Sequence, residues 1–125
     1  MDIRLQLVAI DCGDPLALAR FYGALLGRDL APLAPDEDPE RPQWVDLEDL
    51  GGVTIAFQRV EHPVAPTWPE GPVPQQMHLD LAVDDPAAAE ARVLALGARL
   101  ATHQPGRDFR VLIDPAGHPF CLVKA

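Results

Sequence analysis

The sequence predicts an α+β fold in which a strand–helix–strand–strand–strand unit occurs twice, with two curved mixed sheets forming a cup and the helices outside. The first observation is an alternating apolar and polar segment, residues 77–84, that runs directly into Asp85-Pro86 and an Ala-rich segment. The second is that residues 7–15 repeat this arrangement at a constant offset. The third is that Asp114 and Gly117 repeat the turn residues Asp49 and Gly52. Period-two alternation indicates half-buried strands, and self-similarity along a chain indicates a repeat architecture.

The first unit is predicted to span residues 1–61. Asp14 followed by Pro15 predicts a helix start, because Asp caps the first amides and Pro fits the first helical position. Gly27 is a natural residue to follow the helix end. The other predicted elements are strands at 3–11, 29–33, 43–48 and 53–60, a mobile acidic loop at 34–40 with a solvated charge run at 36–40, and a turn at 49–52.

The second unit is predicted to span residues 75–125, and the whole chain, 1–125, is predicted to be one domain. A connector at 62–74 holds five prolines in thirteen residues, which predicts an extended rather than a packed segment. The predicted elements are a strand at 77–84, a helix beginning at Asp85-Pro86, strands at 109–113 and 119–124, and a turn at Asp114.

Composition limits the kind of partner. The chain of 125 residues has a net charge of −9, and residues 1–62 hold 12 acids against 5 bases. Such a surface repels nucleic acid and anionic membranes and attracts a cationic ligand. Every apolar stretch is shorter than a membrane span, and the N-terminus lacks the pattern of a signal peptide. With two cysteines and no disulfide framework, we expect a cytoplasmic protein.

Alternation also assigns the two faces of the predicted strands. In the segment 77–84 the side chains of Met77, Leu79, Leu81 and Val83 are expected to face the helix, which leaves His78 and Asp80 on the opposite face. The repeat extends that opposite face to Leu7, Ala9, Asp11, Thr54, Ala56, Gln58, Pro119, Cys121 and Val123. A mixed apolar and polar wall of this kind is typical of a small-molecule site.

Several segments resemble one known family. They are the paired Asp-Pro helix starts, the Phe21-Tyr22…Leu26-Gly27 helix end, the turn from Asp114 to Phe120, and the segments 57–60, 74–81 and 117–123. Together they make the chain similar to the vicinal oxygen chelate superfamily of glyoxalase I, bleomycin resistance and extradiol dioxygenase proteins, and to a bacterial glyoxalase-like subgroup. The resemblance covers nearly the whole chain. It implies the fold but no single activity, because the superfamily holds isomerases, transferases, dioxygenases and pure binders.

The resemblance also implies four metal-ligand positions, which are Leu7, Ala56, His78 and Cys121 in this chain. Leu7 and Ala56 have no ligating atom, whereas His78 offers an imidazole and Cys121 a thiolate. Two ligands fall short of the three that catalytic zinc takes and of the oxygen ligands that magnesium prefers. We therefore expect no metal or other cofactor. If a metal binds, His78 with Cys121 or Asp80 is the expected ligand set.

The candidate site residues follow from these faces. His78 and Asp80 are candidates for catalysis, and the candidate ligand contacts are Gln58, His78, Asp80, Cys121, Trp44 and Trp68. Each also has a simpler interpretation: His78 as a wall residue paired with Asp80, Cys121 as a small buried hydrophobe, and Trp44 as partial core. Trp68 lies in the connector, where it is expected to cap a cup or a dimer seam.

Three classes of function remain open. The first is a small-molecule binder without a catalytic metal, of the sequestration, resistance or sensing type. The second is a glyoxalase-type lyase or isomerase, metal-assisted or with His78 and Asp80 as acid and base. The third is a structural or dimerisation module. In each case we expect a homodimer, and the Ala, Pro and Arg content suggests a GC-rich bacterial genome.

Overall fold

The computed structural model describes residues 2–48 and 50–125, so the predicted turn residue Asp49 lies outside the described residues. The chain divides into two compact units, Met1–Pro63 and Val64–Ala125. Each unit holds one helix and one mixed sheet, of three strands in unit 1 and four in unit 2, which confirms the predicted α+β class. Neither described helix is long and apolar enough to cross a membrane.

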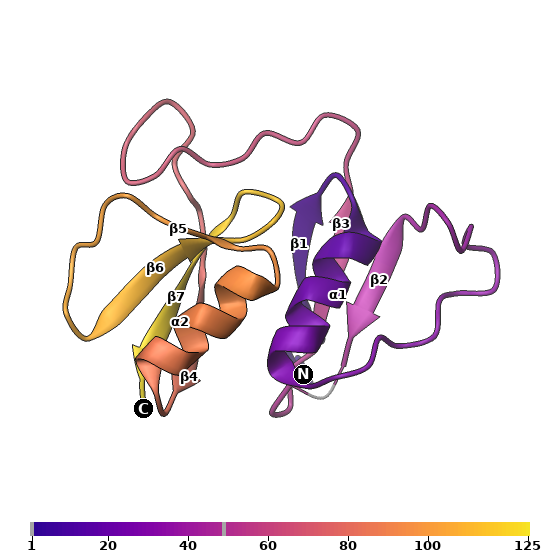
Figure 1. Ribbon diagram of the computed structural model, residues 1–125. Coiled ribbons are helices and arrows are strands. Elements are labelled where there is room, and N and C mark those ends of the chain that lie inside the picture. The colour runs from indigo at the N-terminus through magenta and orange to yellow at the C-terminus, as the bar shows by residue number, and fades with distance from the viewer. Residues whose placement is uncertain (1, 49) are drawn as a thin grey trace. The chain divides into compact units, whose positions relative to one another are not determined.

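Unit 1 is a three-stranded sheet with a helix against one face (Figure 1). Its elements are β1 (Val8–Cys12), α1 (Pro15–Leu26), β2 (Trp44–Leu47) and β3 (Ile55–Arg59). The strand order is β1-β3-β2, with β1 parallel and β2 antiparallel to the central strand β3.

Helix α1 forms where its caps and apolar spacing predict it. The Asp14 side chain accepts a hydrogen bond from the Ala17 amide at 3.2 Å, and Gly27 ends the helix with φ 67°. A positive φ costs glycine little, because glycine has no Cβ to clash with the following carbonyl. The buried face of the helix includes Leu18, Phe21 and Tyr22, and the Tyr22 ring stacks on Phe57 of β3 with centroids 5.8 Å apart. This apolar layer is the core of unit 1.

Unit 2 repeats the connectivity of unit 1 and adds one strand. Its elements are β4 (Leu79–Val83), α2 (Pro86–Ala95), β5 (Arg99–Leu100), β6 (Phe109–Ile113) and β7 (Pro119–Lys124). The strand order is β4-β7-β6-β5, in which only the β4–β7 pair is parallel. Asp85 caps α2 through the Ala88 amide at 3.2 Å, as the repeat predicts.

Three predicted strand segments are wrong in extent. Residues 29–33 form no strand, and Ala31 donates a single hydrogen bond to the Asp46 carbonyl, at 3.1 Å. Pro32 follows at once and has no amide hydrogen to continue the pairing. Strand β1 begins at Val8, not at residue 3. Strand β4 begins at Leu79, so Met77 lies before the sheet and is 75% exposed instead of covering the helix.

Side chains from the preceding loops bind backbone groups at the edge strand β2 of unit 1 and at the part of β6 in unit 2 that extends beyond its pairing with β5. In unit 1, the Glu37 carboxylate accepts from the Gln43 amide at 3.0 Å and the Trp44 amide at 2.8 Å. The sequence predicts that Glu37 belongs to a solvated charge run. In the structure its carboxylate instead accepts hydrogen bonds from the backbone. In unit 2, the Gln104 amide accepts from Val111 N at 2.9 Å and donates to Val111 O at 2.8 Å.

The proline-rich connector is not simply extended. Thr67 N donates to the Val73 carbonyl at 2.6 Å, and Val73 N donates back to Thr67 Oγ1 at 3.0 Å, which closes a short loop. Trp68, on this loop, packs against the apolar cluster of Ala101, Val111 and Ile113 in unit 2. The prediction of an unpacked connector is therefore wrong for this segment. Proline limits backbone hydrogen bonding but does not prevent a side chain from packing.

Candidate functional site

Strand register brings the central site residues together. In the parallel pair β4–β7, Asp80 lies opposite Cys121, and in the antiparallel pair β6–β7, Cys121 lies opposite Val111. Facing residues in a sheet point to the same side. Asp80, Cys121 and Val111 therefore form one row across three strands of unit 2. His78 precedes β4 by one residue and lies two positions from Asp80, so it extends the same face.

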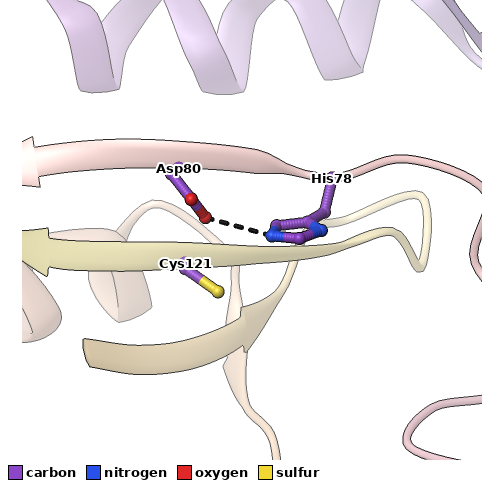
Figure 2. A group of neighbouring side chains, drawn as sticks. All are labelled: His78, Asp80 and Cys121. Atoms are coloured by element: carbon purple, nitrogen blue, oxygen red, sulfur yellow. Dashed lines mark ion pairs between the residues drawn. The ribbon is translucent and has the colours of Figure 1, made fainter. Parts of the chain in front are cut away.

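The side chains of His78 and Asp80 lie within hydrogen-bond distance of each other (Figure 2). The His78 Nε2 atom lies 3.2 Å from Asp80 Oδ1, and the two side chains are 42% and 60% exposed. When the imidazole is neutral, a carboxylate at this distance favours the tautomer with its proton on Nε2. The Nδ1 atom then keeps its lone pair and acts as a hydrogen-bond acceptor.

Cys121 lies against the same carboxylate. Burial raises the pKa of the Cys121 thiol to about 11, and Asp80 contributes through its negative charge and by accepting a hydrogen bond from the thiol. Near pH 7 the sulfur is therefore a protonated donor to Asp80, not a thiolate nucleophile. The Asp80 carboxylate is thus approached by two groups, the His78 imidazole and the Cys121 thiol.

A pocket of about 200 Å³ opens beside this group in unit 2. Its walls are mostly apolar, and the polar members are few. The apolar lining residues are Trp68, Phe109, Val111, Pro119 and Phe120, and the other three are Gln75, His78 and Cys121. This composition matches that of small-molecule sites, in which a few polar groups orient a ligand held by apolar contacts.

Two lining residues, Gln75 and Trp68, have further features that bear on ligand binding. Gln75 Oε1 is buried without a hydrogen-bond partner, and it is the one such side-chain atom in the part of the chain that the structure describes. A buried acceptor without a donor costs about 1–3 kcal/mol. Trp68 is supported from the other side by His103, with ring centroids 5.7 Å apart. The connector loop thus supplies one wall of the pocket.

The other predicted ligand contacts, Trp44 and Gln58, lie in unit 1. They face each other across β2 and β3, and Asp11 faces Gln58 across β1 and β3. The Trp44 indole donates to Asp46 Oδ1 at 2.6 Å, which fixes the ring on the sheet face. Gln58 and Asp11 are exposed. Unit 1 therefore has its own polar face, formed by an aromatic ring, an amide and carboxylates.

The donor atoms of His78, Asp80 and Cys121 lie within 4.8 Å of one another and could meet at one ion. Zinc accepts such a mixed set when the sulfur is a thiolate. In this chain the thiol proton is held by burial and by Asp80, and Asp80 also engages the imidazole. A hard cation would find only one carboxylate among the three. The three donors match the number of protein ligands of a catalytic zinc, but binding would require loss of the thiol proton.

Sequence reasoning missed four lining residues, which are Gln75, Phe109, Val111 and Phe120. Phe109 and Val111 share the face of Cys121, and the alternation of residues 109–113 could have placed them there once the strand register was known. Gln75 lies before the predicted strand, where period-two alternation does not apply. No sequence signal identifies its buried oxygen.

Comparison with known proteins agrees with this architecture. The sequence profile described as "Glyoxalase-like domain" matches residues 7–123. The chain belongs to the glyoxalase-like domain family. No curated protein sequence matches it.

Solved structures of the glyoxalase/bleomycin resistance/dioxygenase superfamily share the fold of this glyoxalase-like chain. A family enzyme from Burkholderia phytofirmans PsJN is 19% identical, with a TM-score of 0.71 and 98% of each chain covered. The fosfomycin resistance protein FosX from Mesorhizobium loti is 18% identical, with a TM-score of 0.69 over 98% of this chain and 92% of FosX. TioX from Micromonospora sp. ML1 is 20% identical, with a TM-score of 0.64 and 98% coverage of each. At these identities the likeness establishes the fold alone.

Proposed function

We propose that this glyoxalase-like protein binds a small organic molecule in the unit 2 pocket, without a catalytic metal, in a sequestration, resistance or sensing role. The observation that carries the proposal is the aromatic wall of Trp68 and Phe109 beside the His78–Asp80 pair. FosX is named a resistance protein, which supports a resistance role for this fold. Cys121 is a further proposed ligand contact in this pocket, and Trp44 and Gln58 are proposed ligand contacts on the separate polar face of unit 1.

A thermal-shift panel of small organic molecules tests this proposal. A ligand at one hundred times its Kd adds about 2.7 kcal/mol of stability, which raises Tm by on the order of 10 °C for a chain of this size. Trp68→Ala should remove most of that shift. Val64→Ala is the matched control, because Val64 is 71% exposed in the same connector and does not line the pocket.

Metal analysis tests the second part of the proposal. Purified protein incubated with zinc and then dialysed should retain well under one equivalent. Stoichiometric zinc that survives dialysis and is lost in His78→Ala would contradict a metal-independent site. Cys121→Ser serves as the second variant, because it removes the sulfur and leaves the imidazole.

The alternative function is a lyase or isomerase in which His78 and Asp80 transfer a proton next to a carbonyl. The observation that favours it is the same 3.2 Å pair, since a carboxylate that orients an imidazole is a common arrangement of a general base. Protein incubated with carbonyl compounds in D₂O would then catalyse deuterium uptake at the adjacent carbon. Exchange that is abolished by His78→Ala would establish this alternative, and its absence favours the binder.

We also propose a homodimer in a bacterial cytoplasm. Exposed apolar side chains support an interface: Ile3, Leu5 and Met77 are 82%, 76% and 75% exposed. Single large apolar side chains on a surface are ordinary, so the interface is inferred from Ile3 and Leu5, which lie two residues apart in unit 1. Light scattering should give twice the chain mass, and Ile3→Asp with Leu5→Asp should reduce it to one. A monomeric wild-type chain would contradict the proposal.

A further inference from the structure

The unit 2 pocket has room for about one ring. Its volume of about 200 Å³ is below the ~300–1,000 Å³ of pockets that hold drug-sized ligands. Trp68 and Phe109 supply flat aromatic surface, and Val111 packs in the same cluster. Aromatic rings prefer offset or edge-to-face contact with other rings. A single planar aromatic group therefore matches these walls.

Two of the polar residues that line the pocket, His78 and Gln75, each offer an acceptor atom. In the neutral imidazole of His78 the Nε2 proton faces Asp80 and Nδ1 presents a lone pair, and Figure 2 shows this second ring nitrogen on the side away from Asp80. Gln75 adds the buried Oε1 atom that has no donor in the described chain. A ligand that brings an N–H group satisfies such acceptors, whereas one that brings only lone pairs does not.

The charge near the pocket also opposes an anion. Neither Lys nor Arg is among the residues that line it, and Asp80 lies against His78 and Cys121. The basic residue between Phe109 and Val111 on β6 is Arg110, and it is held by Glu90 of α2 at 2.9 Å. An anionic ligand would therefore lose its hydration without gaining a cationic partner.

We infer that this pocket selects a single planar aromatic group that donates an N–H hydrogen bond to His78, in neutral or cationic form, and rejects the corresponding carboxylate. The inference rests on the proposed function and names the ligand class of that site. Asp80 is the positioning residue, because it fixes which nitrogen of His78 accepts. Asp80 has this role without touching the ligand.

Three compounds of nearly identical shape test the inference: benzamidine, benzamide and benzoate. They carry a cationic donor, a neutral donor and an anionic acceptor on the same ring. NMR titration of the wild-type chain should give Kd values for benzamidine and benzamide at least tenfold lower than for benzoate. The indole N–H signal of Trp68, assigned through Trp68→Phe, should shift on binding.

Asp80→Asn separates positioning from simple charge attraction. The Asn amide can donate to Nε2, which moves the imidazole proton to Nδ1 and turns the acceptor into a donor. The preference for benzamide over benzoate should then fall to threefold or less. Asp84→Asn is the matched control, because it removes one exposed carboxylate nearby in sequence, outside the pocket lining. It should leave the tenfold preference between these two compounds in place.

Each outcome decides the inference. Benzoate that binds the wild type as tightly as benzamide would overturn it, as would an equal change of preference in both variants. If none of the three compounds binds below 10 mM, the inference also fails. The proposed function is judged separately, because a hit of another chemical class in the thermal-shift panel, lost in Trp68→Ala, would still support it.

Discussion

The two units share one connectivity but bury their side chains differently. Helix α1 buries six of its residues, including Leu18, Phe21 and Tyr22, whereas Val93 is the one fully buried residue of α2. The difference follows from sequence, because the first turns of α2 consist of alanine where α1 carries leucine and aromatic residues. A larger buried apolar area contributes more stability. Unit 1 therefore has the larger helix–sheet core of the two.

The sheet faces that point away from the helices also differ, and here unit 2 carries the polar side chains at the matching positions. The repeat places Leu7 and Ala9 where unit 2 has His78 and Asp80, and Ala56 where unit 2 has Cys121. Ala56 is fully buried, whereas Cys121 lines a pocket. The comparison indicates that the copies have diverged in role, with packing concentrated in one and reactive side chains in the other.

The largest expected effect tests the difference in packing. Phe57→Ala in unit 1 removes a fully buried ring that stacks on Tyr22, and should lower the free energy of unfolding by about 3–5 kcal/mol. Val93→Ala in α2 should lower it by about 2 kcal/mol, because fewer methyl groups are lost. Urea denaturation measures both. Leu94→Ala, at a position 39% exposed, is the control. Equal losses for Phe57 and Val93 would contradict the comparison.

The second effect concerns the two cysteines. The pKa of Cys121 is raised from 9.0 to about 11, so at pH 8 its thiolate is about a hundredfold rarer than that of an ordinary thiol. In a Cys12→Ala background, alkylation by iodoacetamide should be correspondingly slow at pH 8 and should rise until about pH 11. Asp80→Asn should speed the reaction at pH 8, because the charge that disfavours the thiolate is gone. A plateau near pH 9 would show that the thiol is unperturbed.

A smaller effect is expected at the turn before β7. Asp114 is 3% exposed, and its Oδ1 accepts from the amides of Ala116 at 2.8 Å and His118 at 3.0 Å. Asp114→Ala leaves both amides without this acceptor and should cost about 1–3 kcal/mol. Thermal unfolding followed by circular dichroism measures the loss. Asp114→Asn retains one acceptor oxygen, so a loss as large as that of Ala would count against this role.

The smallest expected effect concerns the helix N-caps, which should contribute equally to stability in the two units. Asp14→Ala and Asp85→Ala each remove an N-cap acceptor at 3.2 Å from its amide, and each should cost about 1 kcal/mol. Serine at either position should restore most of the loss. Urea denaturation of the four variants makes the comparison. A cap that matters in only one unit would show that the repeat is not equivalent at its helix starts.

Local rules predicted much of the fold. The Asp-Pro pairs located both helix starts, and Gly27 located the end of α1, because capping depends on a few neighbouring residues. The repeat predicted the order of the helix and of three strands in each unit, but it did not locate β5, and the fourth strand predicted for unit 1 is not formed. The errors occurred where a local pattern had no partner strand, as at residues 3–7 and 29–33. Alternation shows that a segment can pair but not that it does.

The candidate site was only partly predictable. Alternation placed His78 and Asp80 on one face, and the repeat offset added Cys121, so these three could be grouped from sequence. Trp68 also lines the pocket. Its packing depends on a loop closed by Thr67 and Val73, which is distant in sequence from the residues against which Trp68 packs. Contacts of that kind follow from tertiary structure and have no periodic signature.

The two loop side chains that bind backbone groups at β2 and β6 have a consequence for assembly. Glu37 occupies the amides of Gln43 and Trp44, and Gln104 occupies both the amide and the carbonyl of Val111. An edge strand with free backbone groups is a template on which another chain can add a strand, and this is a route to aggregation. At these positions the template is already filled from within the same unit. The addition of a strand from a second protein molecule is therefore disfavoured at β2 and at the part of β6 that extends beyond β5.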